Sequence, residues 1–565
     1  MTTKSNIKRQ ELKIIPLGGQ EEVGRNMTVF EYDDDIVILD MGLQFPEEDM
    51  PGIDYIIPDI HYLENKKKNI RGVIFSHGHL DHIGAAAHLL PRLGWPPVYG
   101  GKMTLLLLKK RLEEYKLERY LKTHEIKSFK DEIKLGNHFK VGFFKVAHSV
   151  MDAIGIILQT PKGNIIHPGD WRYNLNPVKD QPTDFSYLSR WNTKEQPSVL
   201  MMEALGSTKS GHQLSESEVN KNIRKIIEAA PGRIIIATFA SMIERVAQIV
   251  TIAEELGKKV AMDGYSMKTN IEIAKKIGYV KFSQNVIIDV KDIRNYPPNK
   301  IVLIVTGAQG EDRAALMRIS NGEHRHIKVE KSDTIVFSSS VIPGNERTIQ
   351  RLKDTLYRQA ANVIHKEIMD VHSGGHAFIE DIKLLIRQVK PKYLLPVYAN
   401  YYMLYEACKV AESIGFPKKN MFILDNGNVG VLDDYGFDIK KEKIPIQYVF
   451  VDGFGVGDVG EVVIRDRQVL SKHGMFVIVV VIDKKSGKVK NSPDIISRGF
   501  VYLKESKELL AQTRRKVIEI IDKATGSEGA TNWVYVKDEI KNKIGEFLYR
   551  KTQRKPMVLP VLIEV

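Results

Sequence analysis

The sequence predicts an α/β protein of several domains, and three observations lead to this prediction. The chain has 565 residues, which is too long for one ordinary hydrophobic core. Hydrophobic residues make up 43% of it, enough for well-packed globular domains. Short runs rich in β-branched residues alternate with turn residues and helical patterns along most of the chain. We therefore expect about two to four domains in which strands and helices alternate.

The order of the patterns predicts that one domain is inserted into another. The first 200 residues carry short strands between turn residues, at 36–39, 72–75 and 164–170. From about Leu214 each strand leads into a helical stretch, which is typical of a parallel sheet. These strands are expected at 233–240, 259–264, 301–310 and 334–340. Around Val371 the first pattern returns, so we expect a discontinuous first domain of residues 1–213 and 372–450 around an insert at 214–371.

A third domain is expected at residues 451–565, after a glycine-rich stretch near Asp452. It should form a small α+β unit. Its apolar run at 475–482 is far shorter than the roughly 20 residues of a membrane span and predicts a buried strand. Further strands are expected at 498–503 and 557–565, with a long helix at 506–525.

Charge and cysteine content restrict the partners and the metal chemistry. The 83 Lys+Arg against 70 Asp+Glu give a net charge of +13, which favours a polyanionic partner such as nucleic acid. The single cysteine, Cys408, excludes a disulfide framework and a thiolate-rich zinc site, and it fits a reducing cytoplasm. Any metal must therefore be held by His, Asp or Glu. The polar start of the chain does not predict a secretory signal, so we expect a cytoplasmic protein without a membrane partner.

The segment "FSHGHLDHIGAA", Phe75 to Ala86, crowds four candidate metal ligands into six positions. His77 and His79 follow a buried strand two residues apart, so they can point the same way from an extended backbone. Asp81 and His82 stand at the expected start of a helix and can face that pair across the turn. Imidazole and carboxylate at this density suit zinc, with manganese as an alternative.

Four ligands cannot complete two tetrahedral sites, so further ligands must come from elsewhere. His148 ends an apolar run in "KVAHSVMDAIG", and Asp170 lies in a turn at the end of a strand in "NIIHPGDWR". Each has an ordinary alternative, a packed core histidine and a turn aspartate. Beside the histidine cluster, the interpretation as ligands is favoured.

The segment "VHSGGHAFIED" is a candidate substrate-binding site. Its glycines, Gly374 and Gly375, permit close approach of the backbone, and N–H groups at a helix start favour an anion. We therefore expect a nucleotide phosphate to bind at His372, Ser373, Gly374, Gly375 and His376. The alternative is a plain helix-capping loop.

Together, the H-x-H-x-D-H motif, the later single histidine, the Gly-Asp turn and the "HSGGH" segment resemble the metallo-β-lactamase superfamily, and within it the β-CASP nucleases. The chain is most similar to the ribonuclease J family, whose segments "LGGQEEVGRNMTVFEY", "TFASMIERV", "TGAQGEDRAAL", "VDGFGVGDVG" and "PDIISRGFVY" occur here in the same order. The resemblance covers nearly the whole chain. It implies a metallo-β-lactamase αββα sandwich, an inserted β-CASP parallel α/β domain and a small C-terminal α+β domain.

The resemblance also implies an activity and a set of roles. One divalent metal ion, most simply zinc, would be held by His77, His79 and His148, a second by Asp81 and His82, and Asp170 would bridge them; manganese or magnesium are alternatives. The implied reaction is hydrolysis of single-stranded RNA, 5′-to-3′ and endonucleolytic, with a preference for 5′-monophosphorylated ends, in RNA processing and mRNA decay. His376 would act as general acid or base. Glu203 would take up or release a proton; the alternative is a buried glutamate whose hydrogen bonds are all made within the fold. The implied partners are a second copy bound through the C-terminal domain, in a homodimer or higher oligomer, and other RNA-decay proteins.

One position departs from the family. Where the family carries a final metal-binding histidine in a Pro-Val-His segment, this chain reads Pro396, Val397, Tyr398. A phenol of ordinary pKa near 10 must lose its proton to bind zinc well, so we expect a weaker second site. Three outcomes stay open: an active enzyme with a labile second metal, an enzyme active when metal is plentiful, or a weakly active or inactive RNA-binding subunit that supports a paralogue in a hetero-oligomer. The six intact ligands favour an active enzyme.

Overall fold

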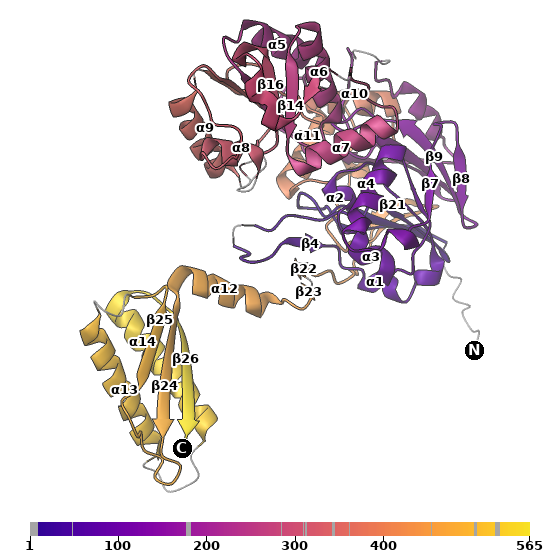
Figure 1. Cartoon of the computed structure of the whole chain (residues 1–565). Coiled ribbons are helices and arrows are strands. Elements are labelled where there is room, and N and C mark those ends of the chain that lie inside the picture. The colour runs from indigo at the N-terminus through magenta and orange to yellow at the C-terminus, as the bar shows by residue number, and fades with distance from the viewer. Residues whose placement is uncertain are drawn as a thin grey trace, which may run out of the picture. The chain divides into compact units, whose positions relative to one another are not determined.

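The computed structural model describes residues 10–47, 49–176, 182–283, 285–308, 310, 314–341, 345–360, 362–453, 455–501, 506–525 and 532–565. The chain divides into two compact units, one of Met1–Phe45 with Ile56–Val449 and one of Pro46–Tyr55 with Phe450–Val565 (Figure 1). Among the helices in these described ranges, none is long and apolar enough to cross a membrane.

Two mixed sheets form the centre of the larger unit. The eight-stranded sheet has the order β21 (Gly436–Ile439), β20 (Gly430–Asp433), β1 (Leu12–Gly18), β2 (Met27–Tyr32), β3 (Asp35–Leu39), β5 (Ile70–Ile74), β6 (Val98–Gly100), β7 (Thr123–Glu125). The six-stranded sheet has the order β19 (Tyr393–Val397), β12 (Ser198–Glu203), β11 (Gly163–His167), β10 (Ile154–Thr160), β9 (Phe139–Lys145), β8 (Glu132–Leu135). Phe30 and Val37 of the first sheet share one core with Phe139 and Ile156 of the second, so the sheets pack face to face.

Helices cover the outer faces of this sandwich. Helices α10 (Ile379–Val389) and α11 (Tyr401–Ser413) bury Leu385 and Leu404 against Ile157 and Leu200 of the six-stranded sheet. On the side of the other sheet lies α4 (Lys102–Glu113), which contacts β6, β7 and α3 (Ala86–Arg92); α1 (His61–Glu64) and α2 (Leu80–Ile83) come before them in the chain. The layers are α, β, β, α, which confirms the predicted sandwich.

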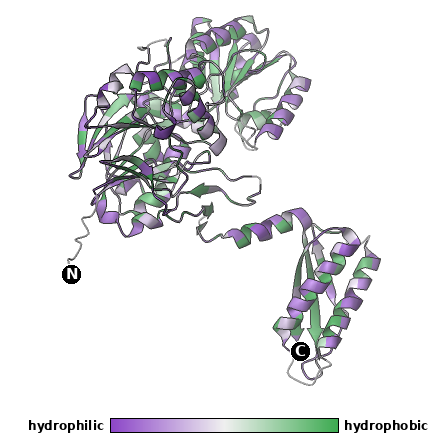
Figure 2. Cartoon of the chain, turned by 180° about the vertical axis from the view of Figure 1, so that it is seen from behind, coloured by the Kyte–Doolittle hydropathy of each residue, from purple (hydrophilic) through white to green (hydrophobic). Residues whose placement is uncertain are grey.

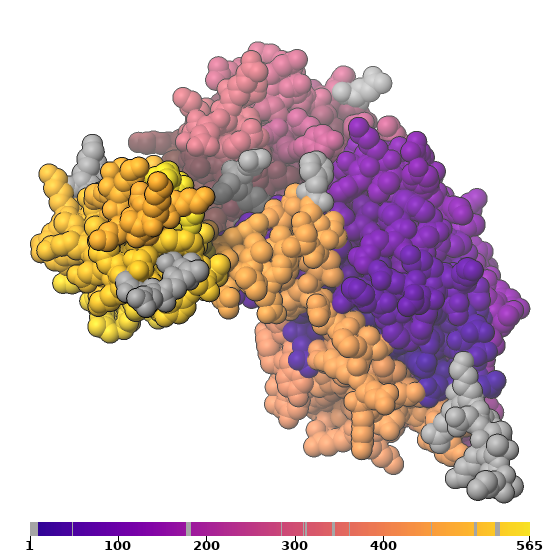
Figure 3. All heavy atoms as spheres, turned by 90° about the horizontal axis from the view of Figure 1, so that it is seen from below, coloured from indigo at the N-terminus to yellow at the C-terminus, as the bar shows by residue number. Residues whose placement is uncertain are grey.

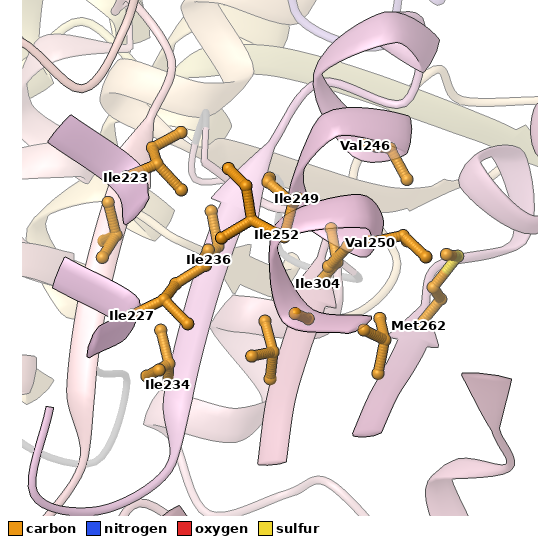
Figure 4. Packing of buried hydrophobic residues seen from close by; sticks show 14 of the residues in the cluster. Ile223, Ile227, Ile234, Ile236, Val246, Ile249, Val250, Ile252, Met262 and Ile304 are labelled. Carbon is orange, nitrogen blue, oxygen red and sulfur yellow. The ribbon is translucent and has the colours of Figure 1, made fainter. Parts of the chain in front are cut away.

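The inserted part is a third sheet, and all of its strands are parallel. Its order is β15 (Ile287–Ile288), β14 (Lys259–Asp263), β16 (Ile301–Val305), β13 (Ile234–Thr238), β17 (Thr334–Ser338), β18 (Asn362–Ile364). Helix α5 (Glu216–Ala229) precedes the first of these strands, and the α-helices between them are α6 (Ile243–Glu255), α7 (Tyr265–Lys276), α8 (Ala315–Ser320) and α9 (Glu346–Gln359). In Figure 4, Ile236 and Ile304 of the strands lie against Ile223 and Ile249 of the helices. The βα repeat expected from the sequence is confirmed.

Helix α5 shows how the sequence sets a local element near the site. Its apolar residues Val219, Ile223 and Ile227 recur every four positions, and all three are buried. Ser215 caps its start by accepting a hydrogen bond from the backbone N–H of Glu218. Glu216, in the first turn, is therefore held at a fixed place next to the sandwich.

The insert leaves and re-enters the sandwich through neighbouring strands. β12 and β19 pair in parallel, with Val199 opposite Tyr393 and Glu203 opposite Val397. A long insertion between two adjacent strands leaves their pairing intact, which explains how the first domain can be discontinuous. Figure 3 shows the pink residues of the insert packed beside the purple ones of the sandwich. The limits 1–213 with 372–450, 214–371 and 451–565 stay predictions.

The smaller unit is a three-stranded sheet covered by helices on one face. The sheet order is β25 (Asp494–Arg498), β24 (Met475–Ile482), β26 (Met557–Glu564), and the helices are α12 (Glu461–His473), α13 (Lys507–Thr525) and α14 (Trp533–Thr552). Residues of β24 alternate between buried and half-buried. Buried Phe476 and Ile478 pack against Val517 of α13 and Ile540 of α14. Figure 2 shows the green strands of this sheet behind helices banded in purple and green.

The prediction for this unit was partly right. The helix expected at 506–525 is confirmed by α13, whereas α14 was not predicted. The strand expected at 498–503 is wrong, because β25 ends at Arg498; residues 502–503 lie outside the described residues. The remaining short elements are β4 (Tyr55–Ile57), β22 (Val449–Asp452), β23 (Gly455–Val456), η1 (Lys67–Asn69), η2 (Glu118–Tyr120), η3 (Ser186–Trp191), η4 (Val290–Asn295), η5 (Pro298–Lys300) and η6 (Lys418–Asn420).

Candidate metal centre

The histidine-rich loop lies between a buried strand and a short helix. β5 ends at Ile74, and the chain runs on to His79, whose extended backbone precedes the first residue of α2. Asp81 and His82 occupy the first turn of that helix. The strand, the loop and the helix therefore hold all four side chains at one end of the sandwich, as the sequence predicts.

Four residues form a first group of ligand atoms. His79 Nδ1 lies 3.0 Å from His77 Nε2 and 3.2 Å from His148 Nε2. Asp170 Oδ2 lies 3.8 Å from each of His77 Nε2 and His148 Nε2. The four ligand atoms all lie within 4.8 Å of one another, so His148 and Asp170, from distant segments, join the loop as expected.

A second group lies on the other side of the Asp170 carboxylate. His82 Nε2 is 3.5 Å from Asp81 Oδ2 and 3.4 Å from Asp170 Oδ1. The two oxygens of Asp170 thus face different groups. This is the arrangement needed for a carboxylate that bridges two cations.

The geometry and chemistry of both groups fit divalent metal ions. In a tetrahedral site with ligand bonds of 2.0–2.2 Å, neighbouring ligand atoms are separated by about 3.3–3.6 Å. The distances in the two groups lie around this range, from 3.0 to 3.8 Å. Asp170 Oδ1 is buried, and its nearest donor among the described residues is His82 Nε2 at 3.4 Å, the atom that a cation would bind in place of its proton.

Neighbouring groups fix the orientation of two of the histidines. His82 Nδ1 lies 2.8 Å from Asp40 Oδ2, and Asp40 also accepts a hydrogen bond from the backbone N–H of Ser76. His148 Nδ1 lies 2.8 Å from the carbonyl oxygen of Gly375. Because these Nδ1 atoms donate, the Nε2 atoms keep their lone pairs for a metal. Sequence patterns do not reveal Asp40, which lies 42 positions before the histidine that it orients.

Burial and charge decide which ligands carry protons without metal. Burial lowers the pKa of His77 and of His148 well below 6.5, so both rings are neutral. Burial also acts to lower the pKa of His82, but the carboxylates of Asp170, Asp81 and Asp40 raise it well above 6.5. A cation at the second group must therefore displace a proton from His82.

His376 and Glu203 lie together beside the ligand groups. His376 Nδ1 is 3.5 Å from Glu203 Oε2 and 3.9 Å from Asp170 Oδ2. Burial alone would lower the pKa of His376, but the charge of Glu203 raises it to about 9. Burial raises the pKa of Glu203, whose other oxygen accepts the backbone N–H of Leu205. The structure thus brings these two predicted residues together, and their catalytic roles stay predictions.

The rest of the 372–376 segment is tied into the fold. His372 Nδ1 accepts from Arg245 Nη1 at 3.0 Å. Ser373 Oγ donates to the carbonyl oxygen of Leu214 at 2.5 Å and accepts from Arg172 Nη1 at 2.9 Å. Gly375 lies against the His148 ring, where a Cβ atom would come within 2.3 Å of it. Phosphate binding by His372, Ser373, Gly374 and Gly375 stays a prediction.

A buried network of charged residues lies behind the 372–376 segment and was not predicted from the sequence. Arg245 donates to both oxygens of Glu216, at 2.6 and 3.1 Å, and Arg172 Nη2 lies 3.5 Å from the same carboxylate. Both arginines are at most 2% exposed. One carboxylate therefore serves two guanidinium groups. Isolated charged residues in helical patterns carry no signal for such a network.

Tyr398 lies directly beside the second group. It follows β19 with a φ of 63°, a conformation uncommon for a bulky residue, and its backbone N–H donates to the carbonyl oxygen of Gly19 at 2.8 Å. Its ring meets that of His82 edge-on, with centroids 5.5 Å apart. Burial, with added effects of the Asp40 and Asp170 charges, raises the pKa of Tyr398 well above 10, so it is a neutral phenol.

Comparison with known proteins agrees with this architecture. The model of the metallo-β-lactamase superfamily matches residues 21–236, that of the ribonuclease J β-CASP domain matches 231–356, and that of the ribonuclease J C-terminal domain matches 462–565. A crystal structure of a protein of unknown function from Enterococcus faecalis V583 shares the fold, with a TM-score of 0.52 and 16% identity, over 75% of this chain and 100% of that one.

Curated relatives match along the whole length. Ribonuclease J2 of Bacillus subtilis (strain 168) is 36% identical over 557 residues, which cover 98% of this chain and 99% of that protein. Ribonuclease J 1 of Streptococcus pyogenes serotype M3 is 36% identical over 561 residues, 99% of each chain. Ribonuclease J 2 of Staphylococcus aureus (strain MRSA252) is 32% identical over 559 residues, again 99% of each. The chain therefore belongs to the ribonuclease J family of metallo-β-lactamase-fold nucleases.

Proposed function

We propose that the protein hydrolyses phosphodiester bonds of single-stranded RNA with two divalent metal ions, as a 5′-to-3′ exoribonuclease that also cleaves internally, in RNA processing and mRNA decay. The observation that carries this proposal is the pair of ligand groups that share Asp170, one with three histidines and one with Asp81 and His82. Zinc is the simplest ion for the first group, because its ligands are three imidazoles and a carboxylate.

The residues around the ligands are arranged for in-line displacement at phosphorus. Two bound divalent ions would lower the pKa of an attacking water and offset the negative charge that develops on the phosphate oxygens. Asp170 sets the separation of the two sites through its two oxygens. Asp40 and the carbonyl of Gly375 keep His82 and His148 in the tautomers that bind metal.

His376 is the residue best placed to exchange a proton with the RNA. Its side chain is 34% exposed, whereas Glu203 and Asp170 are almost fully buried behind it. With a pKa near 9, the ring is protonated at neutral pH in the metal-free protein and can donate to a phosphate oxygen or to the leaving group. Glu203 maintains that protonation, which is the proton-handling role predicted for it.

The region next to His376 suits the phosphates of a strand entering by its 5′ end. Arg172 and Arg245 hold the 372–373 segment in place, and their guanidinium groups are balanced by carboxylates, Glu216 for both and also Glu244 and Asp381 for Arg172. We propose that the segment held in this way receives a 5′-monophosphorylated end in preference to a 5′-hydroxyl.

The smaller unit offers a surface for a second copy of the chain. On the face of its sheet opposite α13 and α14, Ile496, Leu559, Val561 and Ile563 are each about 40% exposed. Adjacent apolar side chains on a solvent-facing sheet are typical of an interaction surface. This supports the proposed homodimer or higher oligomer through the C-terminal domain.

The proposal is tested by incubating the purified full chain, with Mn²⁺ or Zn²⁺, with 5′-monophosphorylated single-stranded RNA and with its circular form. Mononucleotides released from the 5′ end report exonuclease activity, and cleavage of the circle reports endonuclease activity. We expect His77→Ala to abolish both. His61→Ala is the matched control, because His61 is exposed and lies outside both ligand groups.

Because Tyr398 is neutral and buried, a second function is also consistent with the site. The protein would then be an RNA-binding subunit with weak or no activity that supports a paralogue. RNA binding without cleavage at any metal concentration would support that alternative and exclude the nuclease proposal. If the protein neither binds nor cleaves RNA, both are excluded.

A further inference from the structure

The second ligand group is approached by a fourth side chain, that of Asn26. Its terminal amide nitrogen, Nδ2, lies 3.0 Å from His82 Nε2 and 3.4 Å from Asp81 Oδ2. Asn26 stands just before β2, more than fifty positions before Asp81 in the sequence. Its side chain therefore reaches two of the three atoms that would bind the second metal.

The spacing of these atoms is that of a coordination shell. His82 Nε2 is 3.5 Å from Asp81 Oδ2, 3.4 Å from Asp170 Oδ1 and 3.0 Å from the tip of Asn26. In the first group, His79 Nδ1 is separated from the other two imidazole nitrogens by 3.0 and 3.2 Å. Asn26 is thus as close to its group as the histidines of the first group are to each other.

Asn26 is also held rigidly in this place. It is 2% exposed, its backbone N–H donates to the carbonyl oxygen of Asp81 at 3.1 Å, and its carbonyl accepts from the N–H of Gly42 at 2.9 Å. Gly42 permits this approach, because a Cβ atom there would lie 1.6 Å from the carbonyl oxygen of Asp81. The backbone of Asn26 and the ligand loop are therefore locked together, a requirement for a precise metal ligand.

The orientation of the amide differs from that of a ligand by one rotation. As placed, its NH₂ faces His82 and Asp81, while Oδ1 is buried without a donor among the described residues. A half-turn about the bond between Cβ and Cγ exchanges the two atoms with almost no change of shape. A cation bound by His82 Nε2 and Asp81 repels the NH₂ dipole and attracts the carbonyl oxygen, so the carbonyl oxygen is favoured on the site.

We propose that Asn26 supplies its amide oxygen as the fourth side-chain ligand of the second metal, the position that Tyr398 does not fill. This rests on the proposed two-metal site. The second site then has three oxygen ligands and one imidazole, whereas the first has three imidazoles and one oxygen. Carboxylate and carbonyl oxygens suit Mn²⁺ and Mg²⁺, and imidazole suits zinc. The two sites consequently differ in preference, with Mn²⁺ or Mg²⁺ at the second and zinc at the first.

The test titrates Mn²⁺ into the metal-free full chain by isothermal titration calorimetry, with bound metal counted by mass spectrometry after dialysis. The variants are Asn26→Leu, which keeps the volume without the oxygen, Asn26→Asp, which keeps an oxygen, and Tyr398→Phe. We expect two bound ions in the wild type, in Asn26→Asp and in Tyr398→Phe. In Asn26→Leu the second ion should bind at least about 10–100-fold more weakly, with the first unchanged.

Several results would overturn the proposal. A second ion bound by Asn26→Leu with wild-type affinity, or lost in Tyr398→Phe, excludes Asn26 as the ligand. Asn26→Leu counts as misfolded if its thermal midpoint falls and it also loses the first ion. In that case Asn26→Asp is the deciding variant. Equal or tighter binding of the second ion by Asn26→Asp supports the proposal, and weaker binding overturns it. A wild type that binds one ion refutes the two-metal site itself, an outcome distinct from failure of Asn26 alone.

Discussion

Replacing Gly375 by alanine should damage the first metal site through His148, which it touches without being a ligand. A Cβ atom at Gly375 would lie 2.3 Å from His148 Cε1 and 2.4 Å from Nδ1, whereas ordinary contacts begin at 3.4 Å. The ring or the backbone must therefore move by about 1 Å, which also disturbs the 2.8 Å hydrogen bond from Nδ1 to the Gly375 carbonyl. No unusual φ is required at Gly375, so the effect is steric.

The size of the effect follows from that displacement. Disturbing a group that orients a metal-bound histidine costs about 10–100-fold in metal affinity. A misplacement of about 1 Å at a catalytic centre costs about 100-fold in rate, or about 2.7 kcal/mol in activation free energy. We expect Gly375→Ala to weaken the first metal by that factor in a Zn²⁺ competition titration and to slow RNA cleavage correspondingly at saturating RNA.

Gly374→Ala is the matched control. A Cβ atom there would meet the end of the flexible Gln213 side chain at 2.9 Å, which can move aside. Metal affinity should therefore stay within about twofold of the wild type. If Gly375→Ala binds the first metal as tightly as Gly374→Ala does, the contact with His148 does not position that ligand, and the reasoning is refuted.

Three further predictions concern stability, pH and assembly. Glu216→Gln removes the carboxylate that Arg172 and Arg245 share and should cost about 3–5 kcal/mol, seen as a lower thermal midpoint. Glu218→Gln, on the exposed side of the same helix, should not lower it, and equal midpoints would contradict this. Burial and the charge of Arg111 lower the pKa of His88 to about 4, so the unfolded chain binds a proton more readily and His88 destabilises the folded state as pH falls from about 6.5 to about 4. His88→Gln should therefore reduce the drop in thermal midpoint over this pH range. An unchanged dependence of the midpoint on pH would refute this prediction. Val561→Lys, on the half-exposed face of the C-terminal sheet, should shift sedimentation equilibrium towards the monomer; an unchanged mass would exclude that face as the interface.

The layers of the fold could be predicted from the sequence, because each rests on a local pattern. β-branched runs followed by helical stretches gave the parallel sheet, and the return of the first pattern near Val371 gave the insertion. The C-terminal unit was harder. The strand expected at 498–503 lies earlier, at Asp494–Arg498, where Ile495 faces the helices and Ile496 faces away. A short alternation of apolar and polar residues predicts which face of a strand is buried more reliably than it predicts the residue at which the strand ends.

The grouping of the candidate ligands could be predicted where the residue type alone is informative. Histidines and aspartates in one loop indicate metal binding, and His148 and Asp170 join them as expected. Asn26, Asp40 and Gly375 could not be found this way, because amides, lone carboxylates and glycines are common and their partners lie far along the chain. Their roles depend on which distant segments meet, and that becomes visible only in three dimensions.

Two metal ions should flank the Asp170 carboxylate. The decisive measurement is anomalous diffraction at the manganese edge, from crystals of the metal-free full chain equilibrated with Mn²⁺. We expect two peaks, one among His77, His79, His148 and Asp170 Oδ2, and one among Asp81, His82, Asn26 and Asp170 Oδ1. A single peak, or peaks away from Asp170, would refute the two-metal site.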